Sequence, residues 1–353
     1  MANLASRKTG KNVVISTENS TKYWKNANSE EIVCLLCPRT CHIPKDEHGH
    51  CFVRANVNGK MELLTYGLTS GLALDPIEKK PLYHFFPGTN VLSFGTAGCN
   101  LSCNFCQNWN LSKAQNIHVS SVKASPAEIA DKALQAKAVS VAYTYNDPIV
   151  FFEFAVDTAY ECRQNGIYNV AVTNGFINKK PAREFFNAMD AVNIDLKAFS
   201  ELFYKKQTDS SLAPVLKTLQ YVREQTKTWL EITTLLIPGL NDSQKEIQQM
   251  VSWVKQYLGE NTPIHFSAFH PSYQLNTTPT TPLATLTSAR NIALDKGMNY
   301  VYTGNLVYPE GGITHCPSCG KKVIERTGYR TSAQGMQKGK CKFCSQEIAG
   351  RFQ

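Results

Sequence analysis

The sequence predicts an α/β fold with a parallel sheet at its centre and a small cysteine-rich module near each end of the chain. Three observations support this prediction. Short apolar runs alternate with longer amphipathic stretches from Val91 onward, helix-capping signals fall between them, and cysteines gather near both ends. With 353 residues, of which 42% are hydrophobic, the chain is long enough to bury a substantial core.

Seven runs rich in β-branched and aromatic residues are predicted as strands. They cover residues 91–96, 139–145, 168–173, 191–197, 229–237, 264–269 and 300–304. Ser125, followed by Pro126 and Glu128, is a typical helix start, and a second capping signal at residues 241–243 precedes a helix over 244–258. Glycines fall where helices should end, at Gly166, Gly259 and Gly297.

Six strand–helix units and a seventh strand fit a partial (β/α)6 barrel of the triosephosphate-isomerase type. An open, doubly wound sheet fits the same pattern, because periodicity does not distinguish the two. In both folds the side chains at the carboxyl ends of the strands face the ligand. The predicted domains are an N-terminal region with a four-cysteine metal module (1–90), the barrel core (91–310) and a zinc-ribbon-like module (311–353).

Two parts of the N-terminal region have a distinct composition. The leader is polar and carries Arg7, Lys8 and Lys11, so a transit peptide is an alternative to the expected reducing cytoplasm. Residues 75–88 are dense in charged and aromatic groups and are predicted to form a rigid surface loop of undetermined function. No run approaches the roughly 18 apolar residues that a membrane span requires.

The twelve cysteines form three groups and leave one residue over, Cys162, which is predicted to be a buried packing residue. Short spacings in a chain without a secretory signal indicate metal ligands rather than disulfides. The groups are Cys34, Cys37, Cys41 and Cys51; Cys99, Cys103 and Cys106; and Cys316, Cys319, Cys341 and Cys344.

The middle group has the spacing C-x3-C-x2-C, which gives three thiolates for an iron-sulfur cluster. Because a cubane cluster normally takes four cysteines, one iron would remain open to a substrate or cofactor. A structural zinc knuckle is the alternative. This spacing, with Phe105 before Cys106, resembles the radical S-adenosylmethionine superfamily. The resemblance implies a [4Fe-4S] cluster on Cys99, Cys103 and Cys106, with S-adenosylmethionine bound at the open iron and cleaved to a 5'-deoxyadenosyl radical.

Polar side chains follow several of the predicted strands. By the resemblance, S-adenosylmethionine would be contacted or surrounded by Tyr145, Asn146, Asp147, Asn174, Asp195 and Lys197. His270, at the end of a later strand, is a further candidate contact for cofactor or substrate. Asp147 stands where the superfamily usually has a glutamate, and a simple turn over residues 146–148 is the alternative. A solvated salt bridge between Asp195 and Lys197, and a purely structural role for His270, also remain open.

Over nearly the whole chain the sequence resembles the radical enzyme of the AmmeMemoRadiSam system, itself similar to pyruvate formate-lyase activating enzymes. The resemblance rests on Leu36, Cys37, Pro38, Cys41, Cys51 and residues 75–88, 98–109, 144–148, 193–199, 234–242 and 316–320. It implies a reduced ferredoxin or flavodoxin as electron donor and allows a protein substrate or Memo-like system partners. It does not define the reaction.

The two outer cysteine groups each supply four thiolates. The C-terminal spacing is that of a zinc ribbon, with rubredoxin-like iron as the rival, whereas the N-terminal group suits zinc or a second iron-sulfur cluster. A net charge of +9 is compatible with RNA, but metal-bound thiolates would offset much of it, so nucleic acid and membrane partners are not expected.

The predicted function is that of a radical enzyme which abstracts hydrogen from an unknown substrate. Activation of a glycyl-radical enzyme is one alternative within this class. A non-catalytic, metal-dependent RNA-binding or redox-sensing protein, in which all three cysteine groups are structural, is an alternative of another class.

Overall fold

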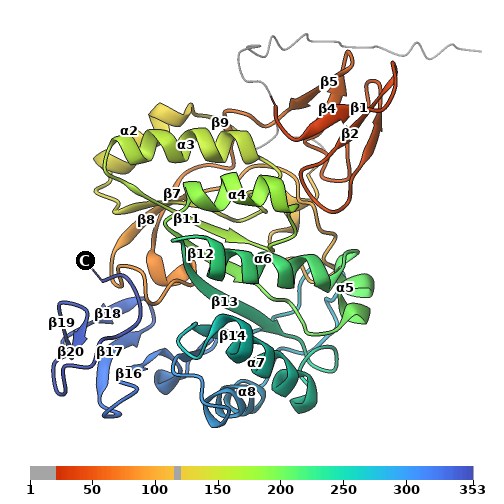
Figure 1. Cartoon of the computed structure of the whole chain (residues 1–353). Helices are drawn as coiled ribbons and strands as arrows, with labels where there is room; N and C mark the ends of the chain where they lie inside the picture. Colours follow the sequence, from red (N-terminus) through yellow and green to blue (C-terminus); the bar gives the residue numbers. More distant parts are fainter. Residues whose placement is uncertain (1–20, 115–120, 353) are drawn as a thin grey trace, which may run out of the picture.

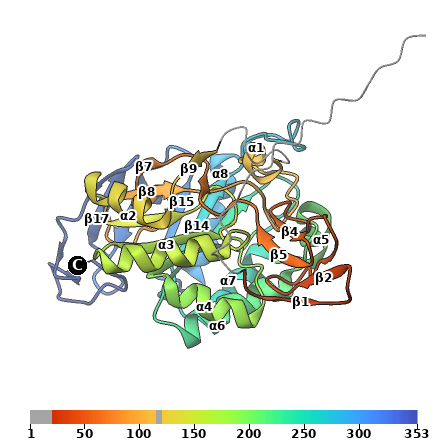
Figure 2. The same cartoon turned by 90° about the horizontal axis from the view of Figure 1, so that it is seen from above.

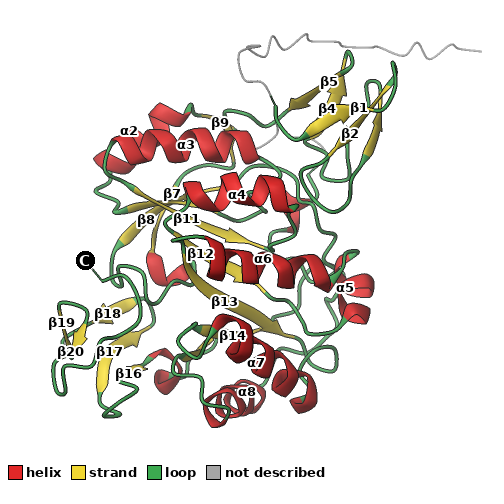
Figure 3. Cartoon of the chain, in the orientation of Figure 1, coloured by secondary structure: helices red, strands yellow, loops and turns green. Residues whose placement is uncertain are grey.

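The computed structural model describes residues 21–114 and 121–352, so the predicted leader with Arg7, Lys8 and Lys11 lies outside the described residues. Its centre is an eight-stranded sheet (Figures 1 and 3). Seven neighbouring strands are parallel and correspond to the seven predicted ones: β8 (Asn90–Phe94), β10 (Ser140–Tyr143), β11 (Tyr168–Thr173), β12 (Ala191–Asp195), β13 (Trp229–Leu236), β14 (Ile264–Ala268) and β15 (Val301–Gly304). β7 (Ala73–Pro76) pairs antiparallel with β8 at one edge.

Helices occupy the connections between these strands. They are α2 (Pro126–Gln135), α3 (Phe152–Gln164), α4 (Lys179–Ala188), α5 (Glu201–Thr208) with α6 (Leu212–Gln225), α7 (Gln244–Leu258) and α8 (Leu283–Asp295). Ser125 and Glu128 form a reciprocal capping box at α2, and Ser243 caps α7, as predicted. No described helix has the length and apolar character needed to cross a membrane.

The strand order distinguishes the two predicted architectures. From β8 to β15 the parallel strands follow one another in chain order without reversal. Right-handed crossovers that advance in one direction place their helices on one face, whereas a doubly wound sheet reverses its order and carries helices on both. Figure 1 accordingly shows α3, α4, α6 and α7 in front of the strands. Since β15 pairs with no strand beyond β14 in the described part of the chain, the predicted partial barrel is confirmed.

Residues 75–88 do not form a surface loop, so that prediction is wrong. Ile77, Leu82 and Phe85 are fully buried in a cluster with apolar residues of β8, β10, β11 and β12. The segment includes the short helix η1 (Ile77–Lys79). An open barrel leaves its concave face uncovered, and the apolar side chains spaced among the charges of this segment fill that face.

Small antiparallel sheets form the two end modules. The N-terminal module contains β1 (Trp24–Asn26), β2 (Glu31–Cys34), β3 (His42–Pro44), β4 (Arg54–Val57) and β5 (Lys60–Leu63), and the C-terminal module contains β16 (Thr314–His315), β17 (Lys322–Thr327), β18 (Arg330–Ser332), β19 (Met336–Gln337) and β20 (Lys340–Cys341). β6 (Leu68–Thr69) pairs with β9 (Val122–Lys123) beside the barrel. The two modules lie at opposite ends of the molecule in both views (Figures 1 and 2). The domain boundaries at residues 90 and 310 stay predictions, and β7 of the first region belongs to the central sheet.

A buried polar network joins residues 75–88 to the amino ends of the last strands and to the C-terminal module. Glu231, at the start of β13, accepts hydrogen bonds from the backbone of Tyr83 and His84 and from the ring of His265. The ring of His84 bonds to the carbonyl of Ala349 at 2.6 Å and to the hydroxyl of Tyr302. The network therefore satisfies groups that would be costly to bury alone.

Acid should weaken this network through His84. Burial lowers the pKa of His84 from 6.5 to about 4, so the folded protein keeps the ring neutral while the unfolded chain binds a proton below about pH 6.5. The stability present above pH 6.5 is then lost as the pH falls toward 4, by about 3 kcal/mol for ~2.5 pKa units. Urea unfolding of the protein and of His84→Gln at pH 7 and pH 4.5 checks this: the variant should show a smaller loss, and equal losses would contradict it.

Candidate active site

The three middle cysteines lie in the loop between β8 and the short helix α1 (Trp109–Ser112), at the carboxyl edge of the sheet. All three are partly exposed. Gly98 begins the loop with a φ of +87°, and a Cβ there would meet the carbonyl oxygen of Cys51 at 2.3 Å. Only glycine therefore fits this position. Burial raises the pKa of the Cys99 thiol, and the backbone N–H of Leu101, which points at its sulfur at 3.5 Å, acts in the opposite direction.

Asn146 holds this loop against the neighbouring strand. Its side-chain oxygen accepts from the N–H of Thr96, and its amide nitrogen donates to the carbonyls of Ala97 and Gly98, the latter at 2.7 Å. The side chain is buried. Asn146 was predicted to bind cofactor, and the geometry makes it a positioning residue for the segment that leads into Cys99.

Other supports of the loop were not predicted. Lys113 donates to the carbonyl of Leu101 at 3.1 Å and to the hydroxyl of Ser102 at 3.0 Å. The N–H groups of Ser102 and Asn104 bond to carbonyls at the end of α5. A lone lysine near the motif carries no pattern in the sequence, so only the folded loop reveals this role.

Asp147 and Asn174 come together behind the loop. The carboxylate of Asp147 accepts from the N–H of Asn174 at 2.7 Å, the N–H of Ile149 at 3.0 Å and the hydroxyl of Thr173 at 3.1 Å. Burial raises the pKa of Asp147 to about 6, against the effect of these donors. The side chain of Asn174 donates to Asn100, next to Cys99, at 2.8 Å. Both predicted residues therefore connect the ends of β10 and β11 to the cysteine loop.

Asp195 and Lys197 form an ion pair of 3.0 Å beside the loop. Burial disfavours the charged form of Lys197, but the charges of Asp195 and of the Cys103 thiolate outweigh burial and raise the lysine's pKa. Burial raises the pKa of Cys103 to about 11, while the charge of Lys197 acts in the opposite direction. The pair is thus coupled to the cysteine group, with the Lys197 side chain 16% and the Asp195 side chain 31% exposed.

Two of the predicted residues lie apart from this cluster. The hydroxyl of Tyr145 bonds to Asp75 at 3.0 Å, so this ring extends toward residues 75–88. Asp75 in turn forms a buried ion pair of 2.7 Å with Lys80. His270 is exposed, and its ring bonds to the carbonyl of Asn305 at 3.0 Å. Among the described contacts none joins either residue to the cysteines, so their cofactor roles stay predictions.

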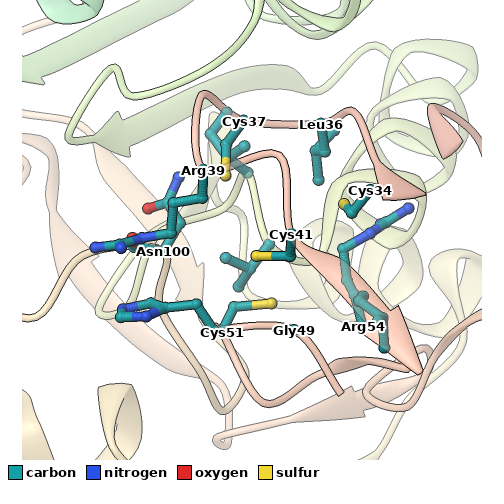
Figure 4. A pocket seen from close by; sticks show the side chains of 13 residues that line it. Cys34, Leu36, Cys37, Arg39, Cys41, Gly49, Cys51, Arg54 and Asn100 are labelled. Atoms are coloured by element: carbon teal, nitrogen blue, oxygen red, sulfur yellow. The ribbon is translucent and has the colours of Figure 1, made fainter. Parts of the chain in front are cut away.

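The two outer cysteine groups differ in shape. In the C-terminal group the sulfurs of Cys316, Cys319, Cys341 and Cys344 all lie within 4.8 Å of one another, and among the described residues this is the one cluster of potential metal ligands with that property. These four residues could bind a metal. The N-terminal four instead line a cavity (Figure 4). Cys162 is fully buried on α3, as predicted.

Comparison with known proteins defines the class of protein. Residues 94–253 match the model of the radical S-adenosylmethionine (SAM) superfamily. The chain is 39% identical over 328 residues to "Uncharacterized protein MJ0808" of Methanocaldococcus jannaschii, and this alignment covers 92% of this chain and 97% of that protein. The chain belongs to the radical SAM superfamily and is an enzyme of that class, which sets aside the non-catalytic alternative.

Two more distant proteins are also similar to this chain. The chain is 21% identical over 190 residues to the pyruvate formate-lyase 1-activating enzyme of Escherichia coli strain K12, covering 52% of this chain and 75% of that one. The crystal structure of Streptococcus suis SuiB bound to S-adenosylmethionine has a TM-score of 0.50 and 16% identity over 66% of this chain and 55% of that chain, a likeness of fold alone. The resemblance to the AmmeMemoRadiSam enzyme stays a prediction.

The superfamily implies a [4Fe-4S] cluster and S-adenosylmethionine, and the described residues fit the cluster. Three partly exposed thiols stand in one short loop, a backbone N–H points at one sulfur, and the charge of Lys197 favours the anionic form of a second. Soft thiolates of this kind are the ligands that iron-sulfur clusters take.

Replacing Asn146 with alanine should release the cysteine loop. At about 1 kcal/mol for each of the three lost hydrogen bonds to the loop backbone, the loop loses about 3 kcal/mol of support. Anaerobically reconstituted Asn146→Ala should therefore bind markedly less iron than the unaltered protein. Asn187→Ala, at an exposed position on α4, is the matched control and should bind the usual amount. Iron analysis per folded chain decides, and an unchanged iron content in Asn146→Ala would refute the positioning role.

Proposed function

We propose that the chain reductively cleaves S-adenosylmethionine at a cluster held by Cys99, Cys103 and Cys106, and that the resulting 5'-deoxyadenosyl radical abstracts hydrogen from a substrate. The observation that carries this proposal is the partly exposed cysteine triplet at the carboxyl edge of the barrel, fixed by Asn146. When bound, the cluster supplies one electron to the sulfonium, whose C5'–S bond breaks to leave methionine.

The surrounding residues suit this role in different ways. The ion pair of Asp195 and Lys197 lies beside Cys103 and offers charges for a zwitterionic nucleotide. Asn174 and Asp147 act as positioning residues, because the bonds within the protein already occupy most of their polar atoms. His270 and Tyr145 are proposed as outer contacts for the cofactor or substrate.

The electron must come from outside the chain, and a reduced ferredoxin or flavodoxin is the proposed donor. Activation of a glycyl-radical enzyme is a second candidate, favoured by the likeness to the pyruvate formate-lyase 1-activating enzyme. In that case the hydrogen would be taken from a protein. A Memo-like partner and a cytoplasmic location also remain proposals.

The cleavage proposal is tested with anaerobically reconstituted, dithionite-reduced protein. The protein should convert S-adenosylmethionine to 5'-deoxyadenosine and methionine, and Cys103→Ala should lower the rate by at least about a thousandfold, since the cluster would lose a ligand and the reaction depends on it. Cys162→Ala, which removes a cysteine outside the three groups, should keep most of the activity. Equal 5'-deoxyadenosine formation by the two variants would refute the role of the triplet.

We also propose that the C-terminal group binds one zinc ion. The sulfurs of Cys316 and Cys344 lie 3.5 Å apart, and those of Cys319 and Cys341 lie 3.7 Å apart. Zinc–sulfur bonds of about 2.3 Å in a tetrahedron place two sulfurs about 3.8 Å apart, so the spacing suits a single ion. A rubredoxin-like iron would fit the same spacing and is the alternative metal for this site.

Loss of this ion should loosen the docked module. Cys341→Ser should contain about one zinc ion fewer per chain and unfold at lower temperature, because a small module depends on its metal for part of its stability. Zinc and iron analysis with thermal unfolding provides the test, and Cys162→Ala is the control. Loss of iron instead of zinc would assign the site to iron, and no change in metal would contradict a metal site.

A further inference from the structure

The N-terminal cysteines surround a small cavity that is partly open to solvent (Figure 4). Cys34, Cys37, Cys41 and Cys51 all line it, and three of these four are buried. Apolar side chains of Leu36, Ile43, Ile149 and Val150 complete much of the wall. Four soft thiolates in a mostly apolar cavity are suited to a soft metal ion or an iron-sulfur cluster rather than to a polar ligand.

The spacing of these sulfurs separates this group from the C-terminal one. A single tetrahedral zinc ion would hold four sulfurs about 3.8 Å apart, as in the C-terminal module. No three of the N-terminal thiols lie within 4.8 Å of one another, since the C-terminal four are the one described cluster that meets this limit. In a polynuclear cluster each thiolate binds a different iron, so the sulfurs stand farther apart and enclose a larger volume.

The cavity shares a wall with the cysteine triplet. Arg39, between Cys37 and Cys41, donates its Nε to the carbonyl of Asn100, which itself lines the cavity. His50, next to Cys51, bonds to the hydroxyl of Ser102 at 2.9 Å. These contacts fasten the N-terminal group to the residues on both sides of Leu101, within the triplet loop.

The charges of the wall also suit an anionic cluster. Arg39 and Arg54 line the cavity, and each keeps an acidic partner outside it, Asp209 at 3.1 Å and Glu153 at 2.7 Å. These ion pairs fix the two guanidinium groups beside the thiolates. The Nε2 of His50 is engaged by Ser102, so this nitrogen is not free to bind a metal.

We propose that Cys34, Cys37, Cys41 and Cys51 bind a second, fully ligated iron-sulfur cluster of the [4Fe-4S] class, adjacent to the triplet site. With four protein ligands it has no open iron, so it can exchange single electrons but cannot bind S-adenosylmethionine. The proposal rests on the cavity and the sulfur spacing and does not require the proposed cleavage reaction.

The test is metal analysis of full-length protein reconstituted anaerobically with iron, sulfide and zinc. The unaltered chain should contain about eight iron and eight sulfide, and about one zinc if the C-terminal assignment holds. The triple variant Cys99→Ala, Cys103→Ala, Cys106→Ala should keep about four iron, together with an electron paramagnetic resonance signal on reduction that S-adenosylmethionine does not change. Adding Cys34→Ala and Cys37→Ala to it should remove the remaining iron and the signal.

Several outcomes would overturn the proposal. A triple variant that holds no iron and one zinc more than the C-terminal site accounts for would assign the N-terminal group to zinc. A triple variant that binds neither extra metal nor iron, while folded by circular dichroism, would leave the group without any metal. The proposed cleavage function is judged separately with the double variant Cys34→Ala, Cys37→Ala. This variant should retain about four iron at the triplet, and a double variant without that iron would count against the cleavage function alone. Cys162→Ala controls for the loss of a cysteine that binds no metal.

Discussion

The bonds of one amide, that of Asn146, fix the position of the cysteine loop relative to the sheet. A loop that ends a strand has backbone groups without sheet partners, and Asn146 supplies partners to three of them while extending from the next strand. The close approach of Gly95, where a Cβ would meet the carbonyl oxygen of Thr144 at 2.3 Å, makes this bridge short. Because the bridge joins β8 to β10, the cysteines are held by the rigid part of the barrel rather than by the loop itself.

At the amino ends of the strands the barrel is closed by residues 75–88. An open sheet exposes its concave face, and residues 75–88 fill that face with Ile77, Leu82 and Phe85. The same segment carries the network through Glu231 and His84 to which the C-terminal module attaches. Arg326 of that module adds a hydrogen bond to the carbonyl of Tyr83. The C-terminal module thus packs at the amino ends of the strands, far along them from the edge that bears the triplet.

Much of the fold was predictable because its signals are local. Residues close together in the sequence determine the strand periodicity, the Ser125 capping box and the helix-ending glycines. The same holds for the spacing of Cys99, Cys103 and Cys106. Residues 75–88 were misassigned because their charges resemble a surface loop, whereas Asp75 and Lys80 satisfy each other in a buried pair. The supports at Lys113, Asn100 and Arg39 were invisible for a related reason: each acts on a partner that only the fold brings near.

Gly98 links the two cysteine groups at one end of the molecule. Its missing side chain lets the backbone of Cys51 approach, so a larger residue there would displace both the first cysteine of the triplet and the last cysteine of the N-terminal group. The two groups also share Asn100 and Ser102 as contacts through Arg39 and His50. The N-terminal module is therefore a wall of the cysteine loop rather than an appendage, because Gly98, Asn100 and Ser102 of that loop all contact residues of the N-terminal module.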